Sequence, residues 1–360
     1  MRTIIAGGGT GGHVIPALAV AAELRRRGHD QILLVGTARG LEARLAPRHG
    51  LPLETIDVGA LKRVGLLQKA ATLFRLPYSF WQSGCILDSF QPDVVYGVGG
   101  YASGPVLFMA AMRNVPIVVH EPNAAPGFAN RCVAPFVTRA LVGFPEAARY
   151  FPATRVEVVG VPVRAEFFQV PRKPHPPPIT LLVSGGSQGA RSINRAVIES
   201  LPLFASSGLD VRFIHQTGEK DFREAQAAFE KCGISGQAQV LPFIDDMPAA
   251  FAAADLLICR SGASTLAEVT AAGKAAILVP FPFAADNHQL RNAQSLERAG
   301  AARVILDAEL TGRRLFDAVA ETLPKLNEME ERSRALAKPR AAQRIVEVLE
   351  QAAAGAGPSA

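Results

Sequence analysis

Two glycine-rich loops, one near the start of each half of the chain, most constrain how this protein can fold. Residues 7–13 (Gly-Gly-Gly-Thr-Gly-Gly-His) follow the apolar run 3–6 and precede a helical pattern that begins near Pro16. Residues 185–190 follow the strand-like run 179–183 in the same way. Glycine permits positive φ and close approach of a ligand, and a helix N-terminus offers unpaired N–H groups to an anion. Two such turns, each opening one half of the chain, predict a ligand held between two domains.

Short β-branched runs alternate with helical patterns in both halves of the chain. Near-continuous apolar strands separated by helices are typical of parallel sheets that are covered on both faces. The expected strands are residues 2–6, 31–35, 53–58, 93–98, 116–120, 139–142 and 156–159 in the first half, and 179–183, 211–215, 239–241, 255–259, 276–279 and 302–306 in the second. The predicted fold class is therefore α/β, with two Rossmann-like, doubly wound parallel sheets that bind ligands at the carboxyl ends of their strands.

The length of 360 residues exceeds what one hydrophobic core usually contains, which indicates two domains. We expect a first domain over residues 1–160, a proline-rich linker over 161–178 and a second domain over 179–340. Residues 341–360 would be a helix end followed by a low-complexity, disordered tail. No signal peptide is apparent, and no apolar run reaches the ~18 residues that span a bilayer. The protein is expected to be soluble or to lie on a membrane surface.

Composition and charge narrow the possible partners. The net charge of +6 favours an anionic ligand or an anionic membrane surface. Nucleic acid is not expected, because no Lys/Arg-rich run occurs and aromatic residues make up only 7% of the chain. The four cysteines have neither zinc-knuckle spacing nor the pattern of a disulfide framework, which indicates buried thiols in a reducing cytosol. No metal site and no cofactor are expected.

Polar residues at the ends of predicted strands in the first half are candidates for a site. His13 ends the first glycine loop, so it is either a general base beside an anion site or a histidine that hydrogen-bonds its own loop. Residues 120–123 (His-Glu-Pro-Asn) follow another strand, where ligand binding is favoured over turn chemistry alone. Residues 99–105 form either a third binding loop or a tight strand-to-helix turn.

The domain junction and the second half offer three further candidates. Arg164, at the domain junction, is either a clamp on a diphosphate or an exposed linker arginine. Thr265 and Glu268 fit a capping box, which would make Glu268 structural, although its carboxylate could also accept hydrogen bonds from ribose hydroxyls. Residues 286–289 (Asp-Asn-His-Gln) suit the hydroxyl groups of a sugar, or form a solvated loop.

Two features have competing interpretations. The basic, apolar segment 66–81 is either a membrane-docking helix or an ordinary helix packed on the sheet, and the residues alone favour the second. Gly7, Gly9 and Gly12 satisfy the dinucleotide pattern G-x-G-x-x-G, but the second strand ends without the acidic residue that binds a ribose. Arg39 could instead face a 2′-phosphate, so a nicotinamide-dependent enzyme stays a minor alternative.

Taken in order, these motifs resemble the MurG family, the peripheral-membrane transferases of glycosyltransferase family 28 that act in peptidoglycan synthesis. The resemblance extends over nearly the whole chain. It rests on residues 8–13 with Pro16, 99–101, 120–123, 162–164, 185–191, 243–247, 260–263 and 286–289. His288 departs from the pattern, because some members carry glutamine there, whereas Gln289 matches it.

The resemblance implies a GT-B fold, in which two Rossmann-like domains face a cleft and the last helix crosses back to the first domain. The implied reaction moves N-acetylglucosamine (GlcNAc) from UDP-GlcNAc to the C4 hydroxyl of N-acetylmuramic acid (MurNAc) in lipid I. It inverts the anomeric centre and yields lipid II for cell wall biogenesis, cell shape and cell division. The enzyme would be peripheral, on the cytoplasmic face of the inner membrane, docked on anionic lipids through residues 66–81. Alternatives are a GT-B transferase with another sugar or acceptor, and a nucleotide-sugar-binding protein without catalysis.

The same resemblance implies roles for individual residues. The donor would be bound in the second domain by Arg164, Ser187, Ile244, Ala263, Ser264, Thr265, Leu266, Ala267, Glu268 and Gln289. Ile244 would meet uracil through its backbone, Glu268 the ribose and Gln289 the sugar. Arg164, Ser187 and the helix start after Gly186 would face the diphosphate. The lipid acceptor would be bound in the first domain by Thr10, Gly11, Gly12, Tyr101, His120, Glu121 and Asn123.

An inverting transfer needs a base on the acceptor hydroxyl and a group that stabilises the departing UDP. His13 is the candidate base and Glu121 the second candidate. Arg164 and Ser187 would stabilise the leaving diphosphate together with the helix N-terminus. No Asp-x-Asp metal clasp flanks a strand in a matching place, so a metal is not expected to be required.

Overall fold

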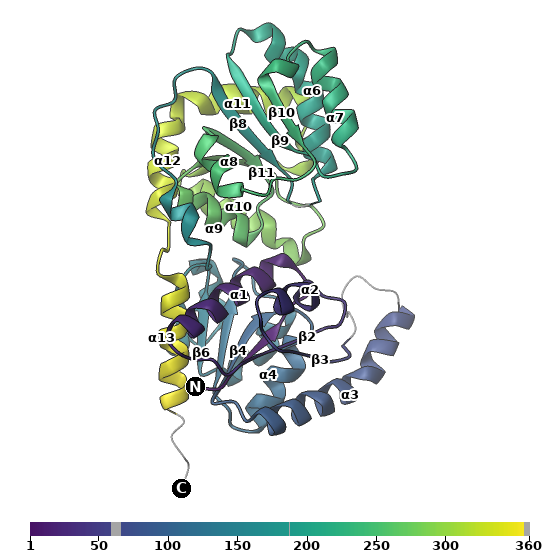
Figure 1. The fold of residues 1–360 in the computed structure, drawn as a ribbon, viewed down its shortest axis with the longest axis vertical. Helices are drawn as coiled ribbons and strands as arrows, with labels where there is room; N and C mark the ends of the chain where they lie inside the picture. Colours follow the sequence, from purple (N-terminus) through teal and green to yellow (C-terminus); the bar gives the residue numbers. More distant parts are fainter. Residues whose placement is uncertain (59–65, 187, 356–360) are drawn as a thin grey trace. The chain divides into compact units, whose positions relative to one another are not determined.

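The computed structural model describes residues 1–58, 66–186 and 188–355, with the backbone alone for residues 66–74. The described residues fall into two compact units. Unit 1 contains Met1–Val163 together with Arg340–Ala360, and unit 2 contains Arg164–Pro339. Figure 1 shows that each unit consists of a central sheet with helices packed against its faces.

Unit 1 is built on a parallel sheet of seven strands. These are β1 (Thr3–Gly7), β2 (Ile32–Gly36), β3 (Leu53–Thr55), β4 (Val94–Gly99), β5 (Ile117–Glu121), β6 (Arg139–Val142) and β7 (Val156–Val158). Their spatial order is β3-β2-β1-β4-β5-β6-β7. β1 and β4 are buried along their whole length, as expected for central parallel strands that helices cover on both faces. The helices of this unit are α1 (Gly11–Arg26), α2 (Leu41–Arg48), α3 (Leu66–Phe90), α4 (Ser103–Met112), α5 (Phe128–Val133) and α13 (Ala341–Ala354).

The last helix of the chain completes the core of unit 1. α13 packs beside α1 and buries Ile345, Val346 and Leu349 in the same apolar cluster as Ile5 and Leu24. Each of these side chains contributes about 1.5–3 kcal/mol through burial. α13 therefore follows unit 2 in the sequence but is an integral part of unit 1.

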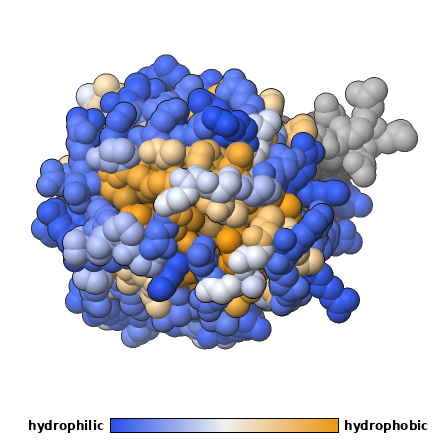
Figure 2. Space-filling model, turned by 90° about the horizontal axis from the view of Figure 1, so that it is seen from above, coloured by the Kyte–Doolittle hydropathy of each residue, from blue (hydrophilic) through white to orange (hydrophobic). Residues whose placement is uncertain are grey.

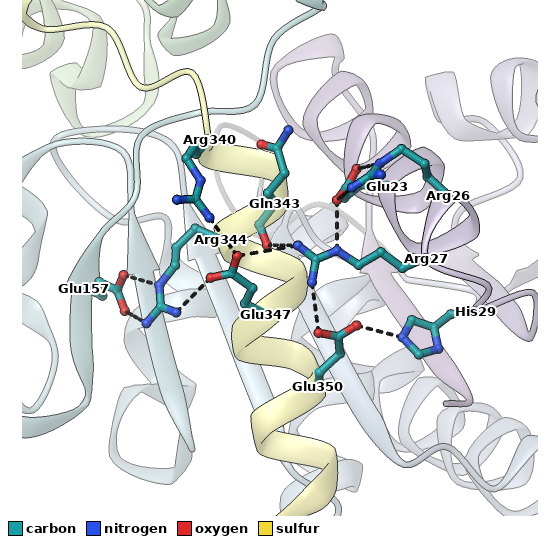
Figure 3. A network of polar contacts seen from close by, with 10 residues as sticks. All are labelled: Glu23, Arg26, Arg27, His29, Glu157, Arg340, Gln343, Arg344, Glu347 and Glu350. Carbon is teal, nitrogen blue, oxygen red and sulfur yellow. Dashed lines mark hydrogen bonds and ion pairs between the residues drawn. The ribbon is translucent and has the colours of Figure 1, made fainter.

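A polar network surrounds the apolar contact of α13 (Figure 3). Arg344 forms a two-pronged ion pair with Glu157 of β7, with N–O distances of 2.6 and 2.9 Å. On the other side, Glu350 accepts hydrogen bonds from Arg27 (3.0 Å) and His29 (2.9 Å). Solvent-exposed ion pairs contribute at most about 1 kcal/mol each, so they orient α13 while the buried side chains hold it.

Unit 2 contains a six-stranded parallel sheet in the order β10-β9-β8-β11-β12-β13. The strands are β8 (Ile179–Ser184), β9 (Val211–Gln216), β10 (Ala238–Leu241), β11 (Leu256–Cys259), β12 (Ala275–Leu278) and β13 (Ala302–Val304). The helices are α6 (Arg191–Ser207), α7 (Phe222–Lys231), α8 (Met247–Ala253), α9 (Ala263–Ala272), α10 (His288–Arg298), α11 (Gly312–Thr322) and α12 (Leu326–Ala335). Partly buried hydrophobic residues, among them Leu209, Phe316 and Leu323, extend the core outward. Seen from above, the surface has apolar residues gathered in its middle and hydrophilic residues around them (Figure 2).

The strands agree with the sequence analysis. All thirteen expected strands occur among the described residues, and the prediction of two doubly wound parallel sheets is confirmed. The edge strands β3 and β13 are shorter than expected, because pairing with their neighbours ends at Thr55 and Val304. Several inner strands run one residue further at the carboxyl end, because that residue still pairs across the sheet, as Gly7 does with Gly99 and Ser184 with Gln216.

Within residues 1–58, 66–186 and 188–355, no helix is both long enough and apolar enough to cross a membrane.

Candidate active site

In both sheets the glycine-rich loops lie at the topological switch point. In unit 1, β1 and β4 are neighbours, and the chain proceeds outward from them in opposite directions, so the loops after these strands diverge. In unit 2, β8 and β11 have the same relationship. Doubly wound sheets bind ligands in the crevice that opens between two such strands at their carboxyl ends. Each unit thus presents its glycine loop where a ligand is expected.

The two switch-point loops of unit 1 pack against each other through glycine. Gly8 N donates to Gly99 O (3.2 Å), and Gly7, Gly9 and Gly100 have φ of +136°, +90° and +90°. A Cβ atom on Gly100 would lie 2.4 Å from Gly8 O, so no side chain fits there. The close approach of these two backbones sets the direction in which α1 starts.

The first turn of α1 is uncapped. Its N-cap residue, Thr10, makes no capping hydrogen bond through its side chain, and no acidic residue lies in the first turn. Thr10 and Gly12 are exposed, and Gly11 is half-buried. The backbone N–H groups and the positive end of the helix dipole therefore face an open loop, which suits an anionic group.

His13 points its imidazole back at the glycine loop. Its Nδ1 lies 3.3 Å from Gly8 O, and because a carbonyl oxygen only accepts, Nδ1 must carry the proton in this bond. Nε2 is then the unprotonated nitrogen. Desolvation lowers the pKa of His13 below its usual value, while the Gly8 hydrogen bond and the charge of Glu42 act in the opposite direction. The imidazole is therefore neutral near pH 7 and able to accept a proton at Nε2.

His120 of β5 is fully buried and neutral. Its Nε2 donates to Gly160 O (2.9 Å), and Nδ1 has no hydrogen-bond partner among the described residues. Burial and, to a smaller extent, the neighbouring His13 lower the pKa of His120 to about 4, while the hydrogen bond to Gly160 opposes the decrease. The ring stacks on Tyr96 with 6.3 Å between ring centroids. His120 thus keeps one unprotonated nitrogen inside unit 1.

The carboxylate of Glu121 organises the loop that follows β5. It accepts hydrogen bonds from Asn123 N (3.0 Å), Asn123 Nδ2 (3.1 Å), Gly127 N (3.0 Å) and Asn130 Nδ2 (3.0 Å). Burial raises the pKa of Glu121, and these four bonds oppose the increase. Because both oxygens are engaged, the side chain positions half-buried Asn123 at the sheet edge. The exposed Tyr101 lies on the neighbouring loop after β4.

The glycine loop of unit 2 is also held in place, by a side-chain hydrogen bond and by a close approach of two backbone segments. Gln216 Nε2 donates to Gly186 O (3.0 Å), and a Cβ atom on Gly189 would lie 1.8 Å from Thr217 O. Gly186 and Gly189 have φ of +89° and +74°. α6 starts directly after this loop without a side-chain cap, so its first N–H groups suit an anion. Ser187, a predicted diphosphate ligand, lies outside the described residues.

Glu268 lies in the second turn of α9, and its carboxyl group forms no hydrogen bond with the described residues. Burial raises the pKa of Glu268 to about 7, and the charge of Arg164 opposes this shift. Arg164 is exposed, with its guanidinium 5.1 Å from the centroid of the Phe167 ring. Unit 2 therefore brings together the cation predicted for a diphosphate and the carboxyl predicted for a ribose.

The capping-box interpretation of Thr265 and Glu268 is wrong. α9 begins at Ala263, because Gly262 takes the extended N-cap conformation (φ −63°, ψ 145°), so Thr265 is already inside the helix. The Ser264 hydroxyl in this first turn is buried without a partner among the described residues. The side chains of residues 263–268 therefore do not cap the N-terminus of α9.

Ile244 and Gln289 complete the predicted donor residues. The Ile244 side chain is buried after β10, beside exposed Phe243. Gln289, in the first turn of α10, accepts from Phe281 N through Oε1 (2.9 Å), and Ser261 Oγ donates to its backbone oxygen (2.8 Å). Among the described residues the amide nitrogen of Gln289 has no hydrogen-bond partner, so it can donate to a ligand hydroxyl.

Comparison with known proteins identifies the family. Residues 3–142 match the glycosyltransferase family 28 N-terminal domain, and residues 180–347 match the family's C-terminal domain. A relative from Solibacter usitatus is 54% identical over 97% of this chain and 96% of its own length. The chain belongs to glycosyltransferase family 28.

Other similar proteins carry the same description. The Solibacter protein and a Myxococcus xanthus relative, 42% identical over 97% of this chain and 92% of its own length, are both named UDP-N-acetylglucosamine–N-acetylmuramyl-(pentapeptide) pyrophosphoryl-undecaprenol N-acetylglucosamine transferase. The crystal structure of Acinetobacter baumannii MurG superposes with a TM-score of 0.81, at 33% identity over 97% of this chain and 99% of that chain. The family resemblance seen in the sequence is confirmed.

Sequence reasoning passed over one residue of the site. Glu42 of α2 is almost fully buried, and its carboxylate accepts from Gly9 N (2.6 Å) and from Thr37 N (2.8 Å). In the sequence it appears only as an acidic residue too far beyond the second strand to bind a ribose. No local motif marks it, since its partners come from two other loops.

A network of Arg260, Ser192 and Asp307 was also not foreseen. Arg260 donates to Asp307 Oδ1 (2.5 Å) and to Ser192 Oγ (2.9 Å), which joins the end of β11 to the start of α6. No cluster of three metal-binding side chains is found in the described part of the chain.

Proposed function

We propose that this protein is an inverting glycosyltransferase that moves GlcNAc from UDP-GlcNAc to the C4 hydroxyl of MurNAc in lipid I. The product is lipid II, with a new β-1,4 bond. The observation that carries the proposal is the match of both units, over nearly their full length, to relatives whose names state this transfer. The glycine loops at both switch points support it, because each suits a diphosphate group.

On the acceptor side, His13 is the proposed catalytic base. Its Nε2 takes the proton of the C4 hydroxyl as that oxygen attacks the anomeric carbon, and the proton on Nδ1 stays bonded to Gly8 O. A positioned base accelerates such a step by about 10²–10⁴-fold. Thr10, Gly11 and Gly12 would face the diphosphate of the lipid.

The sugars of the acceptor would lie along the carboxyl edge formed by β4 and β5. Tyr101, His120 and Asn123 are the proposed contacts. Glu121 is the alternative base, but its four hydrogen bonds favour a positioning role for the loop that carries Asn123.

On the donor side, unit 2 would bind UDP-GlcNAc at its own switch point. Arg164, Ser187 and the N-terminus of α6 would stabilise the negative charge that gathers on UDP as the glycosidic bond breaks. Glu268 would accept hydrogen bonds from the ribose, and Gln289 would contact the GlcNAc hydroxyls. Ile244 would meet uracil through its backbone, with Ala263, Ser264, Thr265, Leu266 and Ala267 around the nucleotide.

We further propose that unit 1 docks on an anionic membrane surface, on the cytoplasmic face. Trp81 of α3 and Met112 of α4 are 61% and 67% exposed, and Trp81 stacks on the exposed Tyr78. The two helices pack together, with Phe80 against exposed Phe108 (5.3 Å between ring centroids). Large exposed apolar side chains that gather on adjacent helices are typical of membrane or protein contact sites.

The test is turnover with defined substrates. The protein is incubated with UDP-GlcNAc and a lipid I analogue, and the formation of UDP and lipid II is measured, with UDP-GalNAc as the control donor. Release of UDP without lipid II, or equal use of UDP-GalNAc, would contradict the assigned transfer.

The His13→Ala variant tests the base. Turnover should fall by about 10²–10⁴-fold, because the acceptor hydroxyl loses its proton acceptor. The affinity for UDP-GlcNAc, measured by calorimetry, should stay unchanged, since the donor residues lie in unit 2. A comparable loss of donor affinity would assign His13 a structural role instead.

A further inference from the structure

We propose that Glu42 is the positioning residue of His13 and acts on it through the single peptide group that joins Gly8 and Gly9. This inference rests on the proposed role of His13 as the base. It concerns a residue that does not touch the substrate.

The geometry places Glu42 and His13 at opposite ends of one peptide group. Gly9 N donates to Glu42 Oε2 at 2.6 Å, and the oxygen of the same peptide, Gly8 O, accepts from His13 Nδ1 at 3.3 Å. A trans peptide is planar, and its N–H and C=O point in opposite directions. The carboxylate, the peptide and the imidazole therefore form a continuous hydrogen-bonded chain.

The carboxylate of Glu42 is held in a cradle that fits it. Thr37 donates to Oε1 from its backbone nitrogen (2.8 Å) and its hydroxyl (3.0 Å). Cβ atoms on Gly8, Gly36 or Gly40 would lie 2.2, 2.5 and 2.1 Å from atoms of the Glu42 side chain. Only glycine fits at these three positions while Glu42 stays where it is.

A glycine peptide needs such an anchor. Gly8 and Gly9 have φ of +154° and +90°, and glycine passes between positive and negative φ at low steric cost. If the Gly8–Gly9 peptide turned over, Gly8 O would leave His13, and Nδ1 would lose the acceptor that holds the proton there. The charge of Glu42 favours the one orientation in which the N–H points toward it.

The same arrangement stabilises the product of proton transfer. When Nε2 takes the acceptor proton, the imidazole becomes a cation that still donates from Nδ1 to Gly8 O. A carboxylate at the far end of the peptide polarises it and strengthens that bond. Carboxylates that bond directly to a catalytic histidine orient it in this way. Here one peptide group is interposed.

The decisive experiment follows the imidazole of His13 by NMR as pH is varied, in the wild type and in Glu42→Gln, with the resonance assigned through His13→Ala. The pKa of His13 should fall by roughly 0.5–1 unit in Glu42→Gln, because a nearby negative charge is lost. His120, a described titratable group that also interacts with His13, has a pKa of about 4. An unchanged His13 pKa would overturn the proposal.

The matched control is Glu23→Gln. Glu23 is a buried, ion-paired glutamate of α1, the helix that carries His13, but its partners are Arg26 and Arg27. Its removal should leave the His13 pKa unchanged. If Glu42→Gln does not fold, Glu42→Asp replaces it, since the shorter side chain keeps the charge but withdraws it from Gly9 N; a His13 pKa equal to the wild type would then refute the proposal.

Kinetics supply the second measurement. In Glu42→Gln, kcat should fall about 10- to 100-fold, a part of what a positioned base contributes, and the acidic limb of the pH–rate profile should move to lower pH. The KM for UDP-GlcNAc should stay the same. In a His13→Ala background, Glu42→Gln should cause no further loss, whereas a purely structural role would add its full effect.

The NMR titration needs no turnover. A shifted pKa in a protein that makes no lipid II would keep the Glu42–His13 coupling and refute only the proposed function.

Discussion

Replacing Glu268 with glutamine should raise the stability of unit 2 at pH 8, and should raise it much less at pH 5. Burial raises the pKa of Glu268 from 4.5 to about 7 in the folded protein. The unfolded chain releases this proton above pH 4.5, whereas the folded protein keeps it until about pH 7. The free energy of unfolding therefore decreases as pH rises from 4.5 toward 7. Above pH 7 the folded protein carries the desolvated charge and the full cost remains. Glutamine has the same shape and no charge, so it removes this cost.

The size of the effect follows from the two pKa values. A difference between 4.5 and about 7, at 1.36 kcal/mol per unit, corresponds to about 3 kcal/mol at pH 8 and about 1 kcal/mol at pH 5. For a unit of this size each kcal/mol moves the melting temperature by about 2–4 °C. The variant should therefore melt roughly 6–12 °C above the wild type at pH 8, and roughly 2–4 °C above it at pH 5.

The assay is calorimetric unfolding of the nucleotide-free protein at both pH values. Glu224→Gln, on the exposed surface of α7, is the control and should leave the melting temperature unchanged. An equal stabilisation at pH 5 and pH 8 would refute the reasoning, because it would have to come from something other than the ionised carboxylate. No stabilisation at pH 8 would do the same.

Three further predictions concern ligand and membrane binding. Arg164→Ala should weaken UDP binding roughly 10- to 100-fold in calorimetry, since charged hydrogen bonds to the diphosphate are lost; unchanged affinity would remove Arg164 from the site. UDP-GlcNAc affinity should rise from pH 6 to pH 8, because ionised Glu268 accepts more strongly, and Glu268→Gln should abolish this dependence. Removing both Tyr78 and Trp81 should reduce sedimentation with anionic vesicles; an equal reduction in Phe283→Ser, a matched exposed aromatic in unit 2, would refute docking through α3.

The strands and the loops that follow them were predictable from the sequence for a local reason. Parallel strands buried on both faces need continuous apolar runs, so β1, β4, β8 and β11 are visible as such. Chain order then places the ends of these strands at one edge of each sheet, where His13, residues 120–123 and the glycine loops lie. The ends of strands and the starts of helices were less predictable from the sequence. Strand pairing and the backbone conformation at the N-cap shift these boundaries by a residue or more. The start of α9 at Ala263 rather than after Thr265 is the clearest case.

What the sequence determined by itself is the α/β architecture and the positions of its ligand-binding loops, because apolar periodicity and glycine act over a few neighbouring residues. Only the tertiary structure decided what each polar side chain does. Both carboxylate oxygens of Glu121 accept hydrogen bonds from its own loop. The carboxyl group of Glu268 is desolvated and forms no hydrogen bond with the described residues. Glu42 contacts the glycine loop from 33 positions away in the chain. A carboxylate's charge state and free lone pairs depend on which groups surround it, and those groups come together only when distant segments pack.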